Sequence, residues 1–391
     1  MRTIVPIFVI QLMATVAVSA ESLTNERIRH YFERATGIPL FETEAESLRA
    51  SLSGANAKDQ ENALFEKLFA EPEFVNSRLS TFVSRLSNEQ SEPYEDLDDY
   101  QVSLLLSITE DRDFRDVFMK SYFIENKSDG LIARPAPSTY ATVGILNSTK
   151  DVIEQFRLNL GSPGGQKSRV LDGYYQDGLF TTNGFGRRFI ADGTNRRPIR
   201  AAYDILLCSP IETWADSSLS PFWIGGDIDR KPGDSHQAFV DRCSSCHSPM
   251  DSQRGSFAYY DYDRMMNEVR RLEEVARKYN QNRSVFPDAE PTIDDSWENL
   301  LTTSVYQKRF GWRGPKRGRG VKSFARMIVD SRQFQVCMTQ KLVQEFCDVS
   351  SRDLVEVKGT PIFQSLADGF RDEGYRVKSL IRNIIKSDLC R

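Results

Sequence analysis

Two cysteines and a histidine stand within five consecutive residues, Cys243-Ser244-Ser245-Cys246-His247. In this C-x-x-C-H spacing, two thiols in a tight turn attach one haem, and the adjacent imidazole binds the iron. Shuffling the six cysteines and three histidines over 391 residues would produce the pattern in fewer than about one sequence in a thousand. The motif therefore predicts one covalent haem c on Cys243 and Cys246, with His247 as the proximal iron ligand.

Two other chemistries also use a C-x-x-C pair. A zinc knuckle would need two further soft ligands at short spacing, but the chain has no second C-x-x-C and no H-x₃₋₅-H. A reactive or structural disulfide of the thioredoxin type would need a βαβ setting, whereas the residues around Cys243 are rich in glycine and poor in strand patterns. Both alternatives stay open, and both predict a colourless protein.

The second axial position of the iron has several candidate ligands. Four methionines lie far enough along the chain to return over the open face of a haem: Met265, Met266, Met327 and Met338. His236 would instead give a bis-histidine site. Met250 is disfavoured, because it follows His247 by only three residues and leaves the same side of the ring. Core packing is the plain alternative for each methionine, and an open position is also compatible with the sequence.

The remaining cysteines form an even set, namely Cys208, Cys337, Cys347 and Cys390. In an oxidising compartment an even set favours one or two disulfides. Four cysteines allow three full pairings, and spacing does not choose among them. We favour a bridge from Cys390 to Cys337 or Cys347, which would tie the chain end to a long helix. Buried free thiols are the alternative.

The segment from Lys308 to Lys322 holds seven cationic residues and no acid, in a chain of net charge −4. It predicts a local positive patch that docks an anionic partner, such as an unidentified acidic redox protein, or contacts haem propionates, anionic lipid or polysaccharide. A solvated loop is the plain alternative. The overall negative charge argues against a general nucleic-acid binder. The scarcity of histidine and the lack of a phosphate-binding loop argue against most hydrolases and nucleotide enzymes.

The pattern along the chain predicts an exported, mainly α protein. Residues 1-20 are interpreted as a cleaved signal peptide, because Arg2 precedes an apolar run that ends in Val18-Ser19-Ala20. No later stretch is long and apolar enough to predict a transmembrane span, so we expect a periplasmic or secreted protein. An amino-terminal helical domain is expected over 21-165, a Gly-rich, loop-rich cytochrome c-like haem segment over 166-260, and a carboxy-terminal helical domain over 261-391.

Helical periodicity also predicts individual elements. The first helix should begin near Thr24 and end at Gly37. Further helices are expected over 151–158, 199–207, 264–279, 297–306, 321–346, and 361–389, the last in two pieces split at Gly374.

Several of these residues resemble a family of exported bacterial proteins, the planctomycete-type cytochrome-like proteins, which also carry a single C-x-x-C-H. The likeness covers roughly residues 175 to 391. It rests on Asp177–Thr181, Asn195–Arg200, Leu206–Pro210, Cys243–Met250, Gly255–Tyr260, Gly311–Pro315, Lys322-Ser323, Asp330–Phe334, Cys337 and Ile384–Asp388. The resemblance implies haem at Cys243, Cys246 and His247, and it implies a helical amino-terminal half.

Three functions are compatible with these residues. The first is a monohaem c-type cytochrome-like protein that transfers single electrons, the porphyrin carrying the chemistry. The second is a haem oxidoreductase with an open distal site that acts on peroxide or a small substrate. The third is a structural or binding protein with a disulfide or zinc knuckle and no haem. We favour the electron carrier over a catalyst, and the sequence offers no candidate catalytic side chain.

Overall fold

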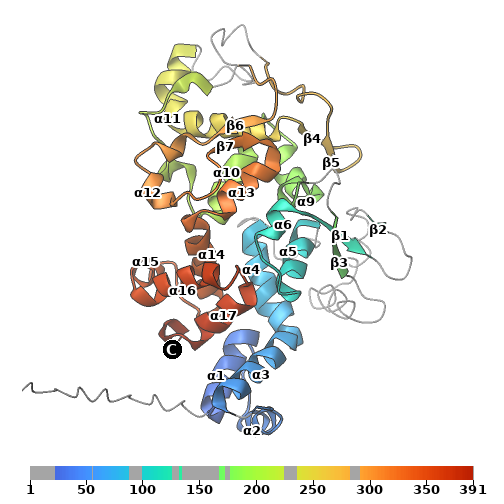
Figure 1. Cartoon of the computed structure of the whole chain (residues 1–391), viewed down its shortest axis with the longest axis vertical. Helices are drawn as coiled ribbons and strands as arrows, with labels where there is room; N and C mark the ends of the chain where they lie inside the picture. Colours follow the sequence, from blue (N-terminus) through green and yellow to red (C-terminus); the bar gives the residue numbers. More distant parts are fainter. Residues whose placement is uncertain are drawn as a thin grey trace, which may run out of the picture.

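The computed structural model describes residues 23–54, 56–87, 99–125, 132–133, 167–171, 177–223, 236–281 and 291–390. Its elements are mainly helices, which confirms the predicted fold class (Figure 1). Among the described residues, no helix combines the length and the apolar character that crossing a membrane requires. The expected signal peptide and the helix expected over 151–158 lie outside the described residues.

Three helices form one end of the molecule in Figure 1: α1 (Asn25–Thr36), α2 (Glu42–Ala50) and α3 (Ala57–Ala70). The prediction for α1 is confirmed at both ends. The Thr24 hydroxyl accepts a hydrogen bond from the Arg27 amide at 3.2 Å, so it caps the helix. Gly37 ends the helix in the left-handed conformation, with φ of 75°, and its amide donates to the Glu33 carbonyl at 2.7 Å.

The chain then passes to the middle of the molecule through a π-helical turn (Phe74–Leu79), α4 (Ser80–Ser87), α5 (Asp99–Thr109) and α6 (Asp116–Met119). A small antiparallel sheet of order β2-β1-β3 follows, made of β1 (Ser121–Glu125), β2 (Ile132–Ala133) and β3 (Lys167–Leu171). Next come α9 (Asn183–Phe185), a second π-helical turn (Gly186–Ile190), α10 (Arg196–Leu206) and α11 (His236–Arg254). Helix α10 confirms the prediction for 199–207, whereas the long helix α11 falls where loops were expected.

Two helices predicted after α11 are wrong. The residues of the first, 264–279, begin in the hairpin of β4 (Tyr260–Asp263) and β5 (Glu268–Arg271) and continue without a helix. The Asp263 carboxylate accepts the amides of Met265 and Met266, at 2.9 and 3.1 Å, and Asn267 has a φ of 53°. These local hydrogen bonds compete with helix formation and close a turn instead.

The second wrong prediction is the helix over 297–306. Strand β6 (Ser296–Glu298) pairs antiparallel with β7 (Arg317–Arg319), and one 3₁₀ turn (Leu300–Thr302) follows. The Asn299 side chain accepts from the Leu301 amide at 3.0 Å, so it caps this short turn.

Six helices complete the chain: α12 (Gln307–Phe310), α13 (Gly320–Val329), α14 (Arg332–Phe346), α15 (Leu354–Lys358), α16 (Pro361–Asp372) and α17 (Val377–Lys386). The single helix predicted over 321–346 is two helices, because Ser331 is extended and its hydroxyl caps α14 by accepting from the Phe334 amide at 3.1 Å. The division of 361–389 at Gly374 is confirmed by α16 and α17, and Gly374 has a φ of 71°.

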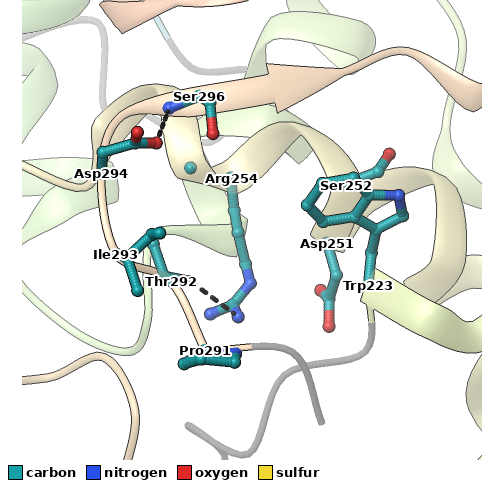
Figure 2. A pocket seen from close by; sticks show the side chains of 10 residues that line it. Trp223, Asp251, Ser252, Arg254, Pro291, Thr292, Ile293, Asp294 and Ser296 are labelled. Carbon is teal, nitrogen blue, oxygen red and sulfur yellow. Dashed lines mark hydrogen bonds between the residues drawn. The ribbon is translucent and has the colours of Figure 1, made fainter.

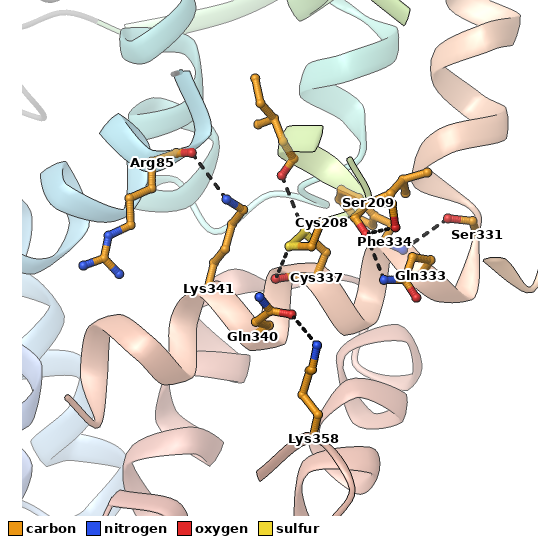
Figure 3. The surroundings of a disulfide bond; sticks show 12 residues. Arg85, Cys208, Ser209, Ser331, Gln333, Phe334, Cys337, Gln340, Lys341 and Lys358 are labelled. Carbon is orange, nitrogen blue, oxygen red and sulfur yellow. Dashed lines mark hydrogen bonds between the residues drawn. A yellow bond between two sulfur atoms is a disulfide. The ribbon is translucent and has the colours of Figure 1, made fainter. Parts of the chain in front are cut away.

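Two disulfides link the four cysteines outside the motif. Cys347 bonds to Cys390, which confirms the expected tie between the chain end and the region of the long helix. Cys208 bonds to Cys337, which fastens the second residue after α10 to α14 (Figure 3). The alternative of buried free thiols is therefore wrong for these four residues.

Candidate functional site

The C-x-x-C-H residues lie within helix α11 rather than in a tight turn. Cys243, Cys246 and His247 occupy positions i, i+3 and i+4, which share one face of an α-helix. All three are half-buried. Cys243 and Cys246 are free thiols, in contrast to the four cysteines that form disulfides. Two reduced thiols and one imidazole therefore stand together on the same side of α11.

A buried carboxylate lies beside the imidazole. The Oδ1 atom of Asp251, one helical turn after His247, is 3.4 Å from the histidine Nδ1. The Asp251 side chain has no exposed surface, and it receives two hydrogen bonds from Arg196, from Nε to Oδ1 at 2.6 Å and from Nη2 to Oδ2 at 2.8 Å. Since the carboxylate faces Nδ1, the other ring nitrogen, Nε2, is directed away from it, as in histidines that ligate a metal.

The charge state of Asp251 follows from these neighbours. Burial raises the pKa of the Asp251 carboxyl, but the charges of Arg196 and His247 outweigh burial and hold its pKa at about 2. The carboxylate is therefore ionised at neutral pH, and it is suited to accept the Nδ1 proton of His247 as a hydrogen bond.

Helix α10 positions Arg196 against α11. Asn195 adopts a left-handed conformation, with φ of 57°, and its side-chain amide donates to the carbonyls of Phe257 at 2.8 Å and Tyr260 at 3.1 Å. These bonds join the start of α10 to the segment that follows α11. Farther along α10, the Tyr203 hydroxyl donates to the Gln253 side chain of α11 at 3.1 Å. The two helices are thus fixed along their contact, and Arg196 is brought to Asp251.

Sequence reasoning missed both Arg196 and Asp251. Asp251 had a signal, since it follows His247 by four residues and would share its helix face once α11 is assigned. Arg196 had none, because it comes from another helix 55 residues before Asp251.

The loop after α10 also contacts the motif. The Asp216 amide donates to the Ser245 carbonyl, between the two motif cysteines, at 2.8 Å. The same loop binds the residues around α12, because Tyr306 donates to the Ala215 carbonyl at 3.1 Å and Arg309 donates to the Thr213 carbonyl at 2.7 Å. One loop therefore connects the start of the cationic segment to the motif.

The seven cationic side chains of this segment are all exposed: Lys308, Arg309, Arg313, Lys316, Arg317, Arg319 and Lys322. Arg319 pairs with Asp294 at 2.7 Å, and within the described part of the chain the other six form no ion pair. The segment therefore presents a positive surface, called here the basic segment.

The expected second ligands are dispersed. Met265 and Met266 are 95% and 63% exposed on the turn between β4 and β5. Met327 in α13 and Met338 in α14 are fully buried, and the Met327 sulfur accepts from the Asn299 side chain at 3.0 Å. His236 is the first residue of α11, and Met250 is buried on the motif's own helix. No second ligand is singled out among the described residues.

Replacing Asp251 by Asn is expected to lower the free energy of unfolding by about 3 kcal/mol, because Arg196 would lose the charge of its buried partner. Urea denaturation followed by circular dichroism measures this change. Asp241→Asn is the matched control, since Asp241 is exposed on the same helix; its effect should stay within about 0.5 kcal/mol. Equal stabilities of the two variants would show that the Arg196 pair contributes little.

The described residues contain no group of three or more His, Cys, Asp or Glu side chains that could hold a metal ion. A structural zinc site needs four such ligands.

Comparison of the chain with known proteins finds no matching family model, no matching curated protein and no matching solved structure.

Proposed function

We propose that this protein is an exported, monohaem c-type cytochrome-like electron carrier, with haem c attached at Cys243, Cys246 and His247. The observation that carries the proposal is the separation of the six cysteines into two kinds. Four form disulfides, whereas the two motif cysteines are free beside a histidine on one helix face. The resemblance to the planctomycete-type cytochrome-like proteins supports the same assignment.

The donors of this site fit a covalently attached haem. Each thiol would add across one vinyl group, its sulfur bonding to one carbon and its hydrogen passing to the other, so that no external oxidant is needed. His247 would bind through Nε2, while Asp251, whose Oδ1 lies 3.4 Å from Nδ1, would accept the Nδ1 proton and orient the imidazole. The haem supplies reversible one-electron chemistry at its iron when bound.

The basic segment gives this carrier a surface for an anionic partner. It is exposed, and the loop of Thr213 to Asp216 joins it to the motif. Positive charge at such a place attracts acidic redox proteins and raises their rate of encounter at low salt.

Neutralising Arg313, Lys316 and Arg317 to Gln is expected to slow oxidation of the reduced protein by ferricyanide several-fold at low salt. The difference should vanish near 1 M salt, where the Debye length is about 3 Å. Stopped-flow absorbance measures these rates. The cationic oxidant hexaammineruthenium should not be slowed, because it is repelled by the patch.

A matched control removes three exposed cations at the other end of the molecule, Arg49, Lys58 and Lys67 of α2 and α3. If this control slows the ferricyanide reaction as strongly, overall charge rather than the basic segment governs the encounter.

A haem oxidoreductase with an open distal position is the second candidate. The positions of the four candidate methionines favour it. Met265 and Met266 are exposed on a hairpin. Met327 and Met338 are fully buried, and the Met327 sulfur accepts a hydrogen bond from Asn299. Carbon monoxide and cyanide distinguish the two. A low-spin spectrum that neither ligand changes would exclude the enzyme, whereas rapid binding of both would favour it over the simple carrier.

The proposal is tested by a visible spectrum of the protein made in a host with c-type cytochrome maturation. The expected result is a Soret band that stays with the polypeptide after denaturation and acid-acetone extraction, with an α-band on reduction. A folded, colourless protein from a host that yields a red control cytochrome would overturn the proposal. Thiol counting and metal analysis would then decide between a disulfide and a zinc site.

A further inference from the structure

The two disulfides differ in their access to solvent. Cys208 is half-buried, whereas Cys337, Cys347 and Cys390 are all buried. Thiol–disulfide exchange begins with the attack of a thiolate on one disulfide sulfur, so its rate depends on access to that sulfur. Among these four cysteines, Cys208 is therefore the one that a thiol in solution reaches most readily.

Cys208 also has a backbone conformation that is uncommon for a residue other than glycine. Its φ is 47°, in the left-handed region that glycine usually occupies just after a helix. The Ser209 amide closes this helix end by donating to the Tyr203 carbonyl at 3.0 Å. A non-glycine residue keeps such a conformation only while its surroundings hold it, and the bond to Cys337 is one of these restraints. Exposed or strained disulfides are the ones that exchange with thiols most easily.

The loop after this disulfide supplies a hydrogen bond that helix α11 cannot make for itself. The carbonyl of Ser245, between the two motif cysteines, would ordinarily accept from the amide four residues later. That residue is Pro249, which has no amide hydrogen. The Asp216 amide donates to the Ser245 carbonyl instead, at 2.8 Å. The Cys208–Cys337 bridge thus anchors the loop that completes the hydrogen bonding of α11 at the motif.

The carboxyl-terminal end of α11 is held by other contacts. Figure 2 shows Arg254, the last residue of the helix, beside the segment 291–296, around a cavity of about 120 Å³. Arg254 donates to the Thr292 hydroxyl at 3.4 Å. The next residue, Gly255, has no space for a side chain, because a Cβ there would overlap the Ser296 carbonyl. Release of the loop should therefore affect the motif and leave this end of the helix in place.

We propose that the Cys208–Cys337 disulfide is a site of thiol–disulfide exchange with an external dithiol, and that its reduction releases the loop from the motif. A thiolate of the dithiol bonds to the Cys208 sulfur, the bond to Cys337 breaks, and the Cys337 sulfur leaves with the electron pair and takes up a proton. The second thiol of the reagent then displaces Cys208 as a thiol and closes a disulfide within the reagent. The protein gains two electrons and two protons, and the dithiol is oxidised. Exchange does not require haem; only its effect on a bound haem rests on the proposed function.

The first experiment measures how fast each disulfide opens in the folded, full chain. Motif thiols that carry no haem are blocked with N-ethylmaleimide, dithiothreitol is added, and new thiols are labelled with iodoacetamide and assigned to peptides by mass spectrometry. We expect Cys208–Cys337 to open about tenfold or more faster than Cys347–Cys390, the matched control within the same chain. The rate should rise in proportion to the dithiothreitol concentration, because the attack is direct.

The site of attack is tested with glutathione, a monothiol, in place of dithiothreitol. An acid quench should trap the glutathione adduct on Cys208 and not on Cys337. Equal rates of opening for the two bridges, faster opening of Cys347–Cys390, or an adduct mainly on Cys337 would each overturn the proposed exchange site.

Hydrogen exchange in the presence of dithiothreitol tests whether the loop is released. The Asp216 amide should exchange several-fold faster after reduction, whereas the Thr292 amide, which donates to the Asn280 side chain at 2.8 Å, should keep its rate. The chain with Cys208→Ala and Cys337→Ala should show the fast exchange without reductant and no further change when it is added. Unchanged exchange at Asp216 after reduction would overturn the release of the loop. These readouts stand even if the spectrum disproves haem attachment.

Discussion

A chain in which both Cys243 and Cys246 are replaced by serine is expected to fold and yet to carry no haem that survives denaturation. The thiols are half-buried and form no disulfide, so serine removes little packing and no crosslink. The two thioether bonds, in contrast, have no substitute, and the expected loss of covalent haem is complete. The Soret absorbance after denaturation and acid-acetone extraction measures it, alongside the thermal unfolding of the same sample.

Ser244→Ala with Ser245→Ala is the matched control, because these residues lie between the cysteines on the same helix. This control should keep the haem of the parent. If the serine-for-cysteine variant retains the Soret band after extraction, attachment uses other residues; if it unfolds, the fold depends on the attached haem or on the thiols themselves.

The sequence predicted the helices that carry strong local signals. Thr24 and Gly37 bound α1 as expected, and Gly374 separates α16 from α17. These ends are set by a side-chain cap and by glycines with positive φ, which are readable from the residues themselves. The apolar spacing of 199–207 likewise predicted α10.

The errors occur where short-range hydrogen bonds or distant partners decide the structure. Asp263 and Asn267 close the β4–β5 turn in a segment whose apolar spacing favoured a helix. Helix α11 escaped prediction because Pro249 and the polar Ser244-Ser245 give little helical periodicity, although tertiary contacts with α10 hold it. Local side-chain hydrogen bonds thus replace the helix expected over 264–279 by a turn, whereas tertiary contacts support α11 despite its weak local signal.

The candidate site was predictable in its covalent part only. Cys243, Cys246 and His247 follow from a motif within five residues, whereas Arg196 reaches Asp251 through the folded contact of two helices. The motif residues that would bind haem are neighbours in the sequence. Arg196, which holds the carboxylate beside His247, is distant in the sequence from the motif.

Removing the Cys208–Cys337 disulfide by alanine substitution of both residues is expected to lower the free energy of unfolding by about 5 kcal/mol. The bridge closes a loop with a sequence separation of 129 residues, so its loss releases much chain entropy in the unfolded state. Cys208 lies two residues after the end of α10 and its partner lies in α14, so the bridge also restrains the helix that presents Arg196. Urea denaturation under non-reducing conditions measures the change.

Alanine substitution of Cys347 and Cys390 is the comparison that separates stability from site geometry. This bridge spans 43 residues and ties the chain end, so its loss should cost about 4 kcal/mol. The two variants thus differ modestly in stability, but only the loss of Cys208–Cys337 should expose the α10 amides to faster hydrogen exchange in the native state. Equal exchange at α10 in both variants would mean that the bonds of Asn195, Arg196 and Tyr203 hold this helix on α11 without the crosslink.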